Sequence, residues 1–437
     1  MSNLPFLSKI LEKIVLKRLL EHIERNNLNE KHQSAYKIYH STETATLKIT
    51  SDILDSLDDR KICLLTLLDL SAAFDTINHN ILIKRLKETF GITGTCLSWF
   101  ESYIRNRKQC VKIGNENSCY STLHCGVPQG SVLGPIIFTM YTQPLADILE
   151  HFDMQYHFYA DDSQIYKVSD YNQLADTITS TEKCLSEIKT WMDFNKLKLN
   201  EQKTEIMLCS NQHVKHLPHV EINFNGHKLL SSSSLKNLGV FLDSDMSMST
   251  QINSMCKNAK FQLFNISRAR HYLTDSITKT LVTTTVLSRL DYCNSLMAGL
   301  TSDKISKIQG VQNMAAKIVT RKNRQDHVTP ILKELHWLPV RERITYKIAL
   351  ICYKCMNDIA PSYLKDILEV YQPNRNLRSS KDKSILKVPS KHYKSYGERA
   401  FSYIGPSIWN NIPQDIRCSE NVNIFKRKLK THIFNNF

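Results

Sequence analysis

The sequence lacks the features of a secreted or membrane protein. No apolar run reaches the roughly 18 residues of a membrane-spanning helix. The start, Met1-Ser2-Asn3-Leu4-Pro5, does not have the charged-then-apolar layout of a signal peptide. The 12 cysteines follow no framework, and Cys352 and Cys355 form a lone CxxC without the second pair that a four-ligand zinc site needs. We therefore expect Cys352 and Cys355 to be buried thiols, and we expect a reducing compartment (nucleus and cytoplasm) and no membrane partner.

The sequence also has no internal repeat and no low-complexity segment. Its 437 residues are enough for two to four folded units at roughly 100–200 residues each. Lys and Arg outnumber Asp and Glu by 57 to 42, giving a net charge of +15. An excess of this size indicates a polyanionic partner, most simply nucleic acid.

The positive charge is concentrated at the C-terminal end. Residues 371–437 carry 13 Lys or Arg against 4 Asp or Glu, so +9 of the +15 lies there. Five aromatic residues are interleaved with these cations and could stack on bases: Tyr393, Tyr396, Phe401, Tyr403 and Trp409. The alternative is a solvated basic face on a terminal domain.

Two adjacent acids lie between two strand-like runs at Tyr159-Ala160-Asp161-Asp162. The flanking runs 154–159 and 163–168 are rich in aromatic and β-branched residues, which predicts a hairpin with the acids at its tip. Paired carboxylates repel each other there, but they suit Mg²⁺, which binds one or two protein carboxylates together with phosphate oxygens. Taken alone, the pair could equally be a solvated turn.

A third acid follows a short apolar run. Residues 62–68 are nearly all apolar and predict a strand buried on both faces, which leads directly into Asp69. A buried acid is costly unless it is paired or bound to a metal. A helix is expected behind it, supported by Ala72, Ala73, Ile77, Ile81, Leu82 and Leu86. The alternative is a structural Asp beside a helix cap at Ser71.

Further elements are predicted along the chain. A Gly/Pro-rich loop at 125–135 places the amide of Gln129 where backbone can approach a ligand closely, and a helix is expected from about Ile136 to Leu149. Strands are expected at 206–209 and 238–242, with a hairpin at Asn223–Gly226. From Ser249 onward the pattern is helical, so a mixed part ends near Asp243.

If the strand and the hairpin are neighbours in one sheet, Asp69, Asp161 and Asp162 converge. Three carboxylates could then hold two Mg²⁺ ions about 3.5–4 Å apart, which stabilise the attacking and leaving oxygens of an in-line displacement. This arrangement is typical of phosphoryl transfer and nucleotide polymerisation.

In this order the motifs resemble the reverse transcriptase of a non-LTR (LINE-type, jockey-like) retrotransposon. The matching segments are Leu68–Asp75 (LDLSAAFD), Gly126–Ser131 (GVPQGS), Tyr159–Asp162 (YADD), Leu197–Thr204 and Leu238–Val240, the last resembling the primer grip. Leu335–Arg341 (LHWLPVR) and Arg399–Phe401, with Pro406 and Trp409, resemble the C-terminal region of such elements. The resemblance covers essentially the whole chain.

The resemblance implies an α+β, right-hand polymerase fold. Residues 1–243 would form fingers and palm, 244–326 a helical thumb, and 327–437 a basic C-terminal domain. It also implies an RNA-directed DNA polymerase that binds an RNA template, a DNA primer or target and deoxynucleoside triphosphates. The implied cofactor is Mg²⁺, as two ions, with Mn²⁺ as a substitute. The oligomeric state stays open.

The resemblance also implies roles for individual residues. Asp69 and Asp161 would hold the metals, with Asp162 assisting. Lys203 would lie near the triphosphate as a general acid toward pyrophosphate. Four residues would contact the nucleotide: Leu70, Phe74, Gln129 and Gly130, with Phe74 as the steric gate that rejects a 2′-hydroxyl. The alternatives are a core aromatic at Phe74 and a surface lysine at Lys203.

Two departures from the family pattern are expected. Such proteins carry, upstream of the Asn3-Leu4-Pro5 equivalent, a fingers segment with an Arg-Pro pair, and an N-terminal endonuclease; neither is present here. The acids after residue 243 form no convincing RNase H pattern. The competing hypotheses are a truncated element copy that binds RNA but is catalytically weak, and a host-adopted splicing factor like an intron maturase.

Overall fold

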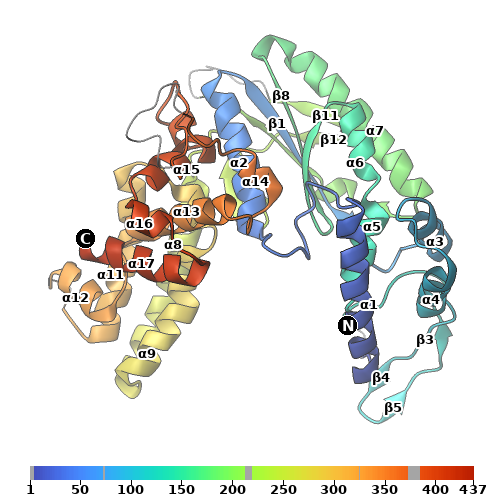
Figure 1. The fold of residues 1–437 in the computed structure, drawn as a ribbon, viewed down its shortest axis with the longest axis horizontal. Coiled ribbons are helices and arrows are strands. Elements are labelled where there is room, and N and C mark those ends of the chain that lie inside the picture. The colour runs from blue at the N-terminus through green and yellow to red at the C-terminus, as the bar shows by residue number, and fades with distance from the viewer. Residues whose placement is uncertain (1–3, 72–73, 212–218, 324, 373–383) are drawn as a thin grey trace.

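The computed structural model describes residues 4–71, 74–211, 219–323, 325–372 and 384–437. Helices and strands are mixed along the chain, which confirms the predicted α+β class. Figure 1 shows two limbs that meet at a central sheet and helix α2. One limb consists of the N-terminal helices α1 and α3–α7, and the other consists of the helices from α8 to α17.

The central sheet has four antiparallel strands in the order β10-β1-β8-β7. They are β1 (Ile62–Leu68), β7 (Gln155–Tyr159), β8 (Asp162–Ser169) and β10 (Glu205–Cys209). Successive side chains of β1 point to opposite faces, so Leu64 and Leu68 enter one core cluster while Cys63 and Leu65 enter the other. The prediction of a strand buried on both faces is confirmed.

One core cluster lies under the N-terminal limb. The helices of this limb are α1 (Phe6–Arg25), α3 (His79–Glu88), α4 (Gly94–Ile104), α5 (Gly134–Thr142), α6 (Leu145–His151) and α7 (Leu174–Phe194). The single helix expected from Ile136 to Leu149 is wrong, because α5 ends at Thr142 and α6 begins after Pro144. Proline has no N–H to donate to the preceding turn, so the helix is interrupted there.

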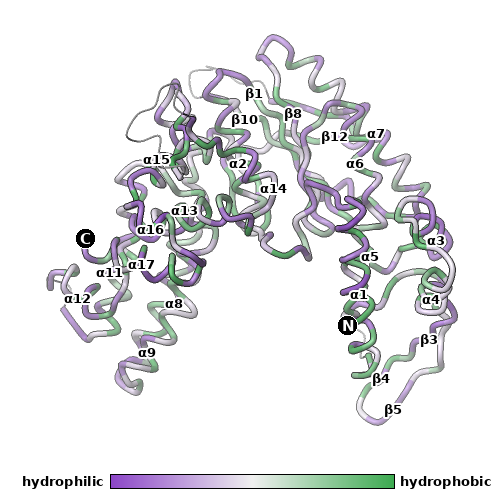
Figure 2. Tube along the Cα trace, viewed as in Figure 1, coloured by the Kyte–Doolittle hydropathy of each residue, from purple (hydrophilic) through white to green (hydrophobic). Residues whose placement is uncertain are grey.

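The second core cluster runs from α2 to the C-terminal helix without interruption. Its helices are α2 (Thr42–Asp58), α8 (Ser249–Ala269), α9 (Asp275–Val282), α10 (Ser288–Asp291), α11 (Ser302–Thr320), α12 (Val328–Leu335), α13 (Val340–Met356), α14 (Ser362–Lys365), α15 (Phe401–Asn410), α16 (Gln414–Arg417) and α17 (Val422–Asn435). The hydropathy colouring of Figure 2 shows apolar stretches along α8 and α13. The helical pattern expected from Ser249 onward is confirmed.

The remaining strands form short antiparallel pairs. The pairs are β2 (Leu70–Ser71) with β9 (Lys198–Leu199), β3 (Lys108–Gln109) with β6 (Ser121–Thr122), β4 (Lys112–Ile113) with β5 (Glu116–Asn117), β11 (Glu221–Phe224) with β12 (His227–Leu230), and β13 (Ser234–Asn237) with β14 (Val240–Asp243). The hairpin expected at Asn223–Gly226 is confirmed. The strand expected at 238–242 is shorter, because Leu238 and Gly239 form a turn with φ of 45° and 83°.

The segment after Asp69 also differs from expectation. Leu70 and Ser71 pair with Leu199 and Lys198 as strands, so no helix begins at this point. The next helix begins only at His79, because the Asn78 side chain accepts hydrogen bonds from the N–H groups of Asn80 and Ile81. Ala72 and Ala73, which were expected in the helix, lie outside the described residues.

The expected stacking aromatics of the C-terminal region are mostly unavailable. Tyr396, Phe401 and Trp409 are at most 3% exposed, because they anchor this region in the core shared with α2. The expectation that these three stack on bases is therefore wrong. Tyr393 packs against the same core, and its hydroxyl accepts a hydrogen bond from Arg60 Nε at 2.8 Å.

Candidate active site

The register of the central sheet brings the three acids to the same end of its two inner strands, β1 and β8. Leu68, the last residue of β1, pairs with Ser163 near the start of β8, and Tyr159 pairs with Asp162 across the hairpin. Asp69 therefore follows directly beside the first residues of β8. The expectation that the strand and the acid-tipped hairpin are neighbours is confirmed.

Asp69, Asp162 and Lys203 line one pocket of about 100 Å³. Lys203 Nζ lies 3.7 Å from Asp69 Oδ2, and Lys203 ends a 3₁₀ turn, η2 (Glu201–Lys203). The Asp69 carbonyl accepts the N–H of Asn200 at 2.9 Å, which ties this acid to the segment that carries Lys203. The rest of the pocket wall comes from β1, β8, β10 and the β13–β14 hairpin: Leu67, Leu68, Ser163, Gln164, Glu205, Lys236, Asn237 and Leu238.

Asp161 lies at the turn beside this pocket rather than in its wall. The pKa of Asp162 is raised to about 6, first by burial and then by the charges of Asp161 and Asp69. The charge of Asp161 therefore acts on the carboxylate in the pocket wall. Crowded carboxylates of this kind are what a divalent cation would stabilise.

The donor set fits a hard cation that shares its coordination with substrate. The acidic side chains at this end of the sheet offer carboxylate oxygens, which are the ligands that Mg²⁺ prefers. Within the described ranges, no three His, Cys, Asp or Glu side chains are gathered closely enough to hold a metal ion by themselves. Mg²⁺ usually binds only one or two protein carboxylates and completes its shell with water and phosphate oxygens.

The turn that carries Asp161 has an unusual backbone. Ala160 has a φ of 59°, a left-handed conformation that normally selects glycine. Its N–H donates to Gln33 Oε1 at 3.2 Å, and Gln33 is 4% exposed. The strained turn is thus held from outside the hairpin.

The loop that contains Gln129 and Gly130 is fixed against the segment after Asp69. Gln129 Nε2 donates to Asp75 Oδ2 at 3.0 Å, and the N–H of Val127 donates to the Phe74 carbonyl at 2.9 Å. At Gly126, with φ of 85°, a Cβ atom would lie 2.9 Å from the Asp75 carbonyl oxygen, so a side chain is excluded.

A buried acid holds the other end of this loop. Glu12 of α1 is 1% exposed, and its Oε2 accepts the N–H groups of Val132 at 2.6 Å and Leu133 at 3.1 Å. Negative charge is favourable at this position, because it precedes the first turn of α5. Sequence reasoning missed Glu12, whose signal was one acid among the apolar positions of α1.

Phe74 and Leu70 occupy different environments. The Phe74 ring is half-buried and lies 5.0 Å from the Phe138 ring, so one side of it packs on α5. Leu70 is 8% exposed and belongs to the core, which leaves its backbone as the part that could contact a nucleotide.

Sequence reasoning also missed three polar residues at the site. Gln164 and Asn237 line the acid pocket, and among the described residues their Oε1 and Nδ2 atoms are buried without a hydrogen-bond partner. Tyr36 lies near Asp161, and its pKa is raised mainly by burial and further by the charge of Asp161. Of these three residues, only Asn237 could have been found from the sequence, because it directly precedes the Leu238-Gly239-Val240 motif.

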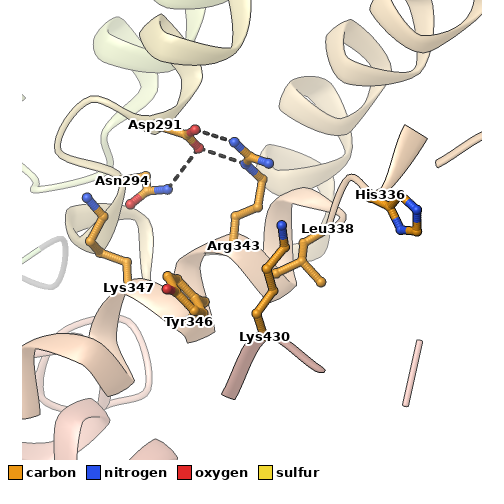
Figure 3. A pocket seen from close by; sticks show the side chains of 8 residues that line it. All are labelled: Asp291, Asn294, His336, Leu338, Arg343, Tyr346, Lys347 and Lys430. Carbon is orange, nitrogen blue, oxygen red and sulfur yellow. Dashed lines mark hydrogen bonds and ion pairs between the residues drawn. The ribbon is translucent and has the colours of Figure 1, made fainter. Parts of the chain in front are cut away.

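A larger cavity of about 340 Å³ lies in the helical limb and contains none of the motif acids. Figure 3 shows the Asp291 carboxylate bonded to the Arg343 guanidinium and to the Asn294 amide at one side of it. Lys347, also in its wall, forms an ion pair with Glu43 at 2.9 Å. Because these groups neutralise one another, the smaller acid-lined pocket is the better candidate for chemistry.

No helix within the described ranges combines the length and apolar character needed to cross a membrane.

Comparisons with known proteins agree with the motifs. The chain is 26% identical over 353 residues to a probable RNA-directed DNA polymerase from transposon BS of Drosophila melanogaster, covering 79% of this chain and 38% of that protein. It is 24% identical over 260 residues to the RNA-directed DNA polymerase from the mobile element jockey of the same species, covering 58% of this chain and 28% of that protein. The chain thus spans well under half the length of these relatives. The resemblance to jockey-like elements is confirmed.

Solved structures of telomerases are similar at low identity. The apo telomerase of Candida tropicalis aligns with a TM-score of 0.40 and 12% identity, covering 80% of this chain and 59% of that one. The telomerase of Candida albicans in complex with a fragment of telomeric RNA aligns with a TM-score of 0.38 and 16% identity, covering 78% and 55%.

The family model for reverse transcriptase (RNA-dependent DNA polymerase) matches residues 1–242, more than half of the chain. With the strand, the hairpin and the loop in the expected order around one acidic pocket, the chain belongs to the reverse transcriptase family.

Proposed function

We propose that this chain is the RNA-directed DNA polymerase of a non-LTR retrotransposon. It would extend a DNA primer along an RNA template by two-metal nucleotidyl transfer. The observation that carries the proposal is the register of β1 with β8, which sets Asp69 and Asp162 in one pocket with Asp161 at the adjoining turn.

The metal ligands would be Asp69, Asp161 and Asp162, holding two Mg²⁺ ions, or Mn²⁺ in their place. Such ions, when bound, stabilise charge on the attacking and leaving oxygens of the displacement. Lys203 Nζ lies 3.7 Å from Asp69 Oδ2 and would donate a proton toward the departing pyrophosphate. Asn237 Nδ2 and Gln164 Oε1, otherwise unpaired, would bond the nucleotide or the primer end.

The nucleotide would be selected by the segment between Leu70 and Gly130. The exposed side of Phe74 would lie under the sugar, and the backbone of Leu70 beside it. Gln129 and Gly130 would contact the base pair between the nucleotide and the template, since hydrogen bonds fix their loop to Asp75 and Phe74.

The nucleic acid would lie between the two limbs, with residues 1–243 as fingers and palm, 244–326 as thumb and 327–437 as the basic C-terminal domain. The net charge of +15 supports a phosphate backbone as the partner. The substrates would be deoxynucleoside triphosphates and the template would be RNA. The protein would work in the nucleus or the cytoplasm.

The test is primer extension by purified full chain on a homopolymer RNA template with Mg²⁺. Asp161→Asn removes the charge without changing size, so extension is expected to be lost while RNA binding stays within about twofold, since phosphate contacts supply most of the affinity. The matched control is Asp170→Asn, an exposed acid just past the opposite end of β8, which should extend like wild type. Extension by Asp161→Asn at the wild-type rate would contradict the proposed site.

A further inference from the structure

The C-terminal region contacts the back of the catalytic hairpin through one buried side chain. Tyr363, in the short helix α14, is 1% exposed and its hydroxyl lies 2.8 Å from Ser34 Oγ. Ser34 Oγ lies 2.8 Å from His157 Nε2, and His157 belongs to β7, which leads into the acid turn. A continuous hydrogen-bonded chain therefore runs from the C-terminal region to the catalytic hairpin.

The ring of Tyr363 is held as tightly as its hydroxyl. It packs edge-on against His157 at 4.8 Å and His40 at 5.7 Å, and it stacks on His32 at 6.5 Å. The hydroxyl also donates to Thr44 Oγ1 at 3.1 Å, at the start of α2. Burial lowers the pKa of His157 and raises the pKa of Tyr363 to about 12. Both side chains are therefore uncharged in this cluster at neutral pH.

The segment around Ser34 also supports the turn itself. The N–H of Ser34 donates to the Phe158 carbonyl at 2.9 Å, and the N–H of Phe158 donates to the His32 carbonyl at 2.8 Å, so this segment extends the sheet beside β7. Gln33 Oε1 then accepts the N–H groups of Ala35 and of Ala160, the strained residue of the turn. The position of Gln33 thus depends on the segment that Tyr363 holds.

We propose that Tyr363 is a positioning residue for the polymerase reaction, acting through Ser34, His157 and Gln33 to fix the turn that carries Asp161 and Asp162. The inference rests on the proposed function for its catalytic consequence. It makes the C-terminal region a part of the catalytic machinery rather than only a basic surface for nucleic acid.

The test compares two buried tyrosines. Tyr363→Phe removes only the hydroxyl that begins the chain. Tyr353→Phe is the matched control, because Tyr353 is also 1% exposed and donates its hydroxyl to the Ser419 carbonyl at 2.7 Å, a bond within the C-terminal region. Hydrogen exchange is measured by mass spectrometry over residues 155–162 in each full-length protein, without nucleic acid.

Faster exchange over 155–162 is expected in Tyr363→Phe and not in Tyr353→Phe, because only the former loosens the hairpin. Primer extension should show kcat lowered about tenfold to a hundredfold, since displacement of reacting groups on the order of 1 Å costs this much. The template KM should be unchanged, and the half-saturating Mg²⁺ concentration should rise. A purely structural role would lower the amount of active protein and leave that Mg²⁺ concentration unchanged.

Equal exchange over 155–162 in Tyr363→Phe and wild type would overturn the inference. If Tyr363→Phe does not fold, Ser34→Ala gives the same comparison with the tyrosine ring left in place. If both variants fold, residues 155–162 of the double variant should exchange no faster than those of the faster single variant. If wild type fails to extend a primer, the proposed function fails, and the exchange comparison still decides whether the hydroxyl holds the hairpin.

Discussion

Phe74 packs against the core with one side of its ring, and we propose that the other side meets the substrate. One side of its ring packs on Phe138, and the half-buried ring belongs to the edge of the N-terminal core. If the free side faces the sugar, Phe74→Val should raise ribonucleotide incorporation about tenfold or more, because a pocket of this kind discriminates by about 1–3 kcal/mol. The measurement is the ratio of kcat/KM for ribo- and deoxynucleotide, with Phe74→Tyr as the control that keeps ring size. An unchanged ratio in Phe74→Val would assign the ring to the core alone.

His157 should make the folded state sensitive to acid. Burial, followed by the charges of His32 and Lys48, lowers the pKa of His157 well below 6.5. Below about pH 6.5 the unfolded chain therefore binds a proton that the folded chain does not, and stability falls as pH decreases by about 1.4 kcal/mol per pH unit for this group. Above that pH both states are neutral and the contribution is constant.

Urea unfolding from pH 7 to 5 measures this effect. The amide of His157→Gln can still bond Ser34. The free energy of unfolding of this variant should fall less steeply as pH decreases than that of wild type, and the two slopes should differ by about 1.4 kcal/mol per pH unit, the effect of one proton. Because His32 and His40 also have lowered pKa values and remain in both proteins, the difference in slope isolates His157. Parallel pH profiles would show that folding does not lower the pKa of His157.

The three acids could be predicted from sequence, but the residues that hold them could not. Asp69 and the Asp161-Asp162 pair each follow or interrupt a strand pattern, so local periodicity was enough to place them. Gln33 and Tyr363 act through contacts that join distant parts of the chain, and neither belongs to a periodic pattern. Glu12 was hidden in the same way, because its partners are backbone N–H groups of a loop about 120 residues away.

At the scale of elements, α17 is the best candidate for a phosphate contact in the C-terminal region. Its buried face carries Phe425 and Leu429, while Arg427, Lys428 and Lys430 are exposed. Replacing these three cations by Gln should weaken RNA binding and lower the slope of log affinity against log salt by about 0.7–0.9 for each phosphate that the protein no longer neutralises. The charge-conserving variant (Arg427→Lys, Lys428→Arg, Lys430→Arg) should keep the wild-type slope. If the neutral variant has the same slope too, α17 is only a solvated face.

Element boundaries show where local patterns fail. The helix expected across Pro144 was overestimated because its apolar positions continue in α6, although the proline breaks the backbone. The C-terminal aromatics were interpreted as a surface because they alternate with lysines, yet Trp409 and Phe401 fill the core beside α2. Composition indicates which residues are near cations, while tertiary packing decides which of them are exposed.

At the scale of the whole molecule, the helical limb and the central sheet share one core. The cluster that begins on α2 continues to α17, and buried Asp58 accepts the N–H groups of His392 at 3.0 Å and Tyr393 at 2.7 Å. Removing residues 327–437 would expose the apolar side chains of this cluster and take away the two N–H donors of Asp58. We expect the full chain to unfold in one transition and residues 1–326 to aggregate. Two separate transitions in calorimetry of the full chain would contradict the shared core.

The contact between Ser34 and Tyr363 also sets an order of events during synthesis. The two residues are 329 positions apart, so at about 5–20 residues per second the second follows the first by on the order of 15–65 s. β1 can pair with β10 well before that, since its partner residues lie near position 209. The acids therefore emerge and gather early, while the support behind their turn arrives last. A product released by a stop codon between residues 243 and 363 would carry Asp69, Asp161 and Asp162 and still lack the Tyr363 hydroxyl that we propose fixes their turn.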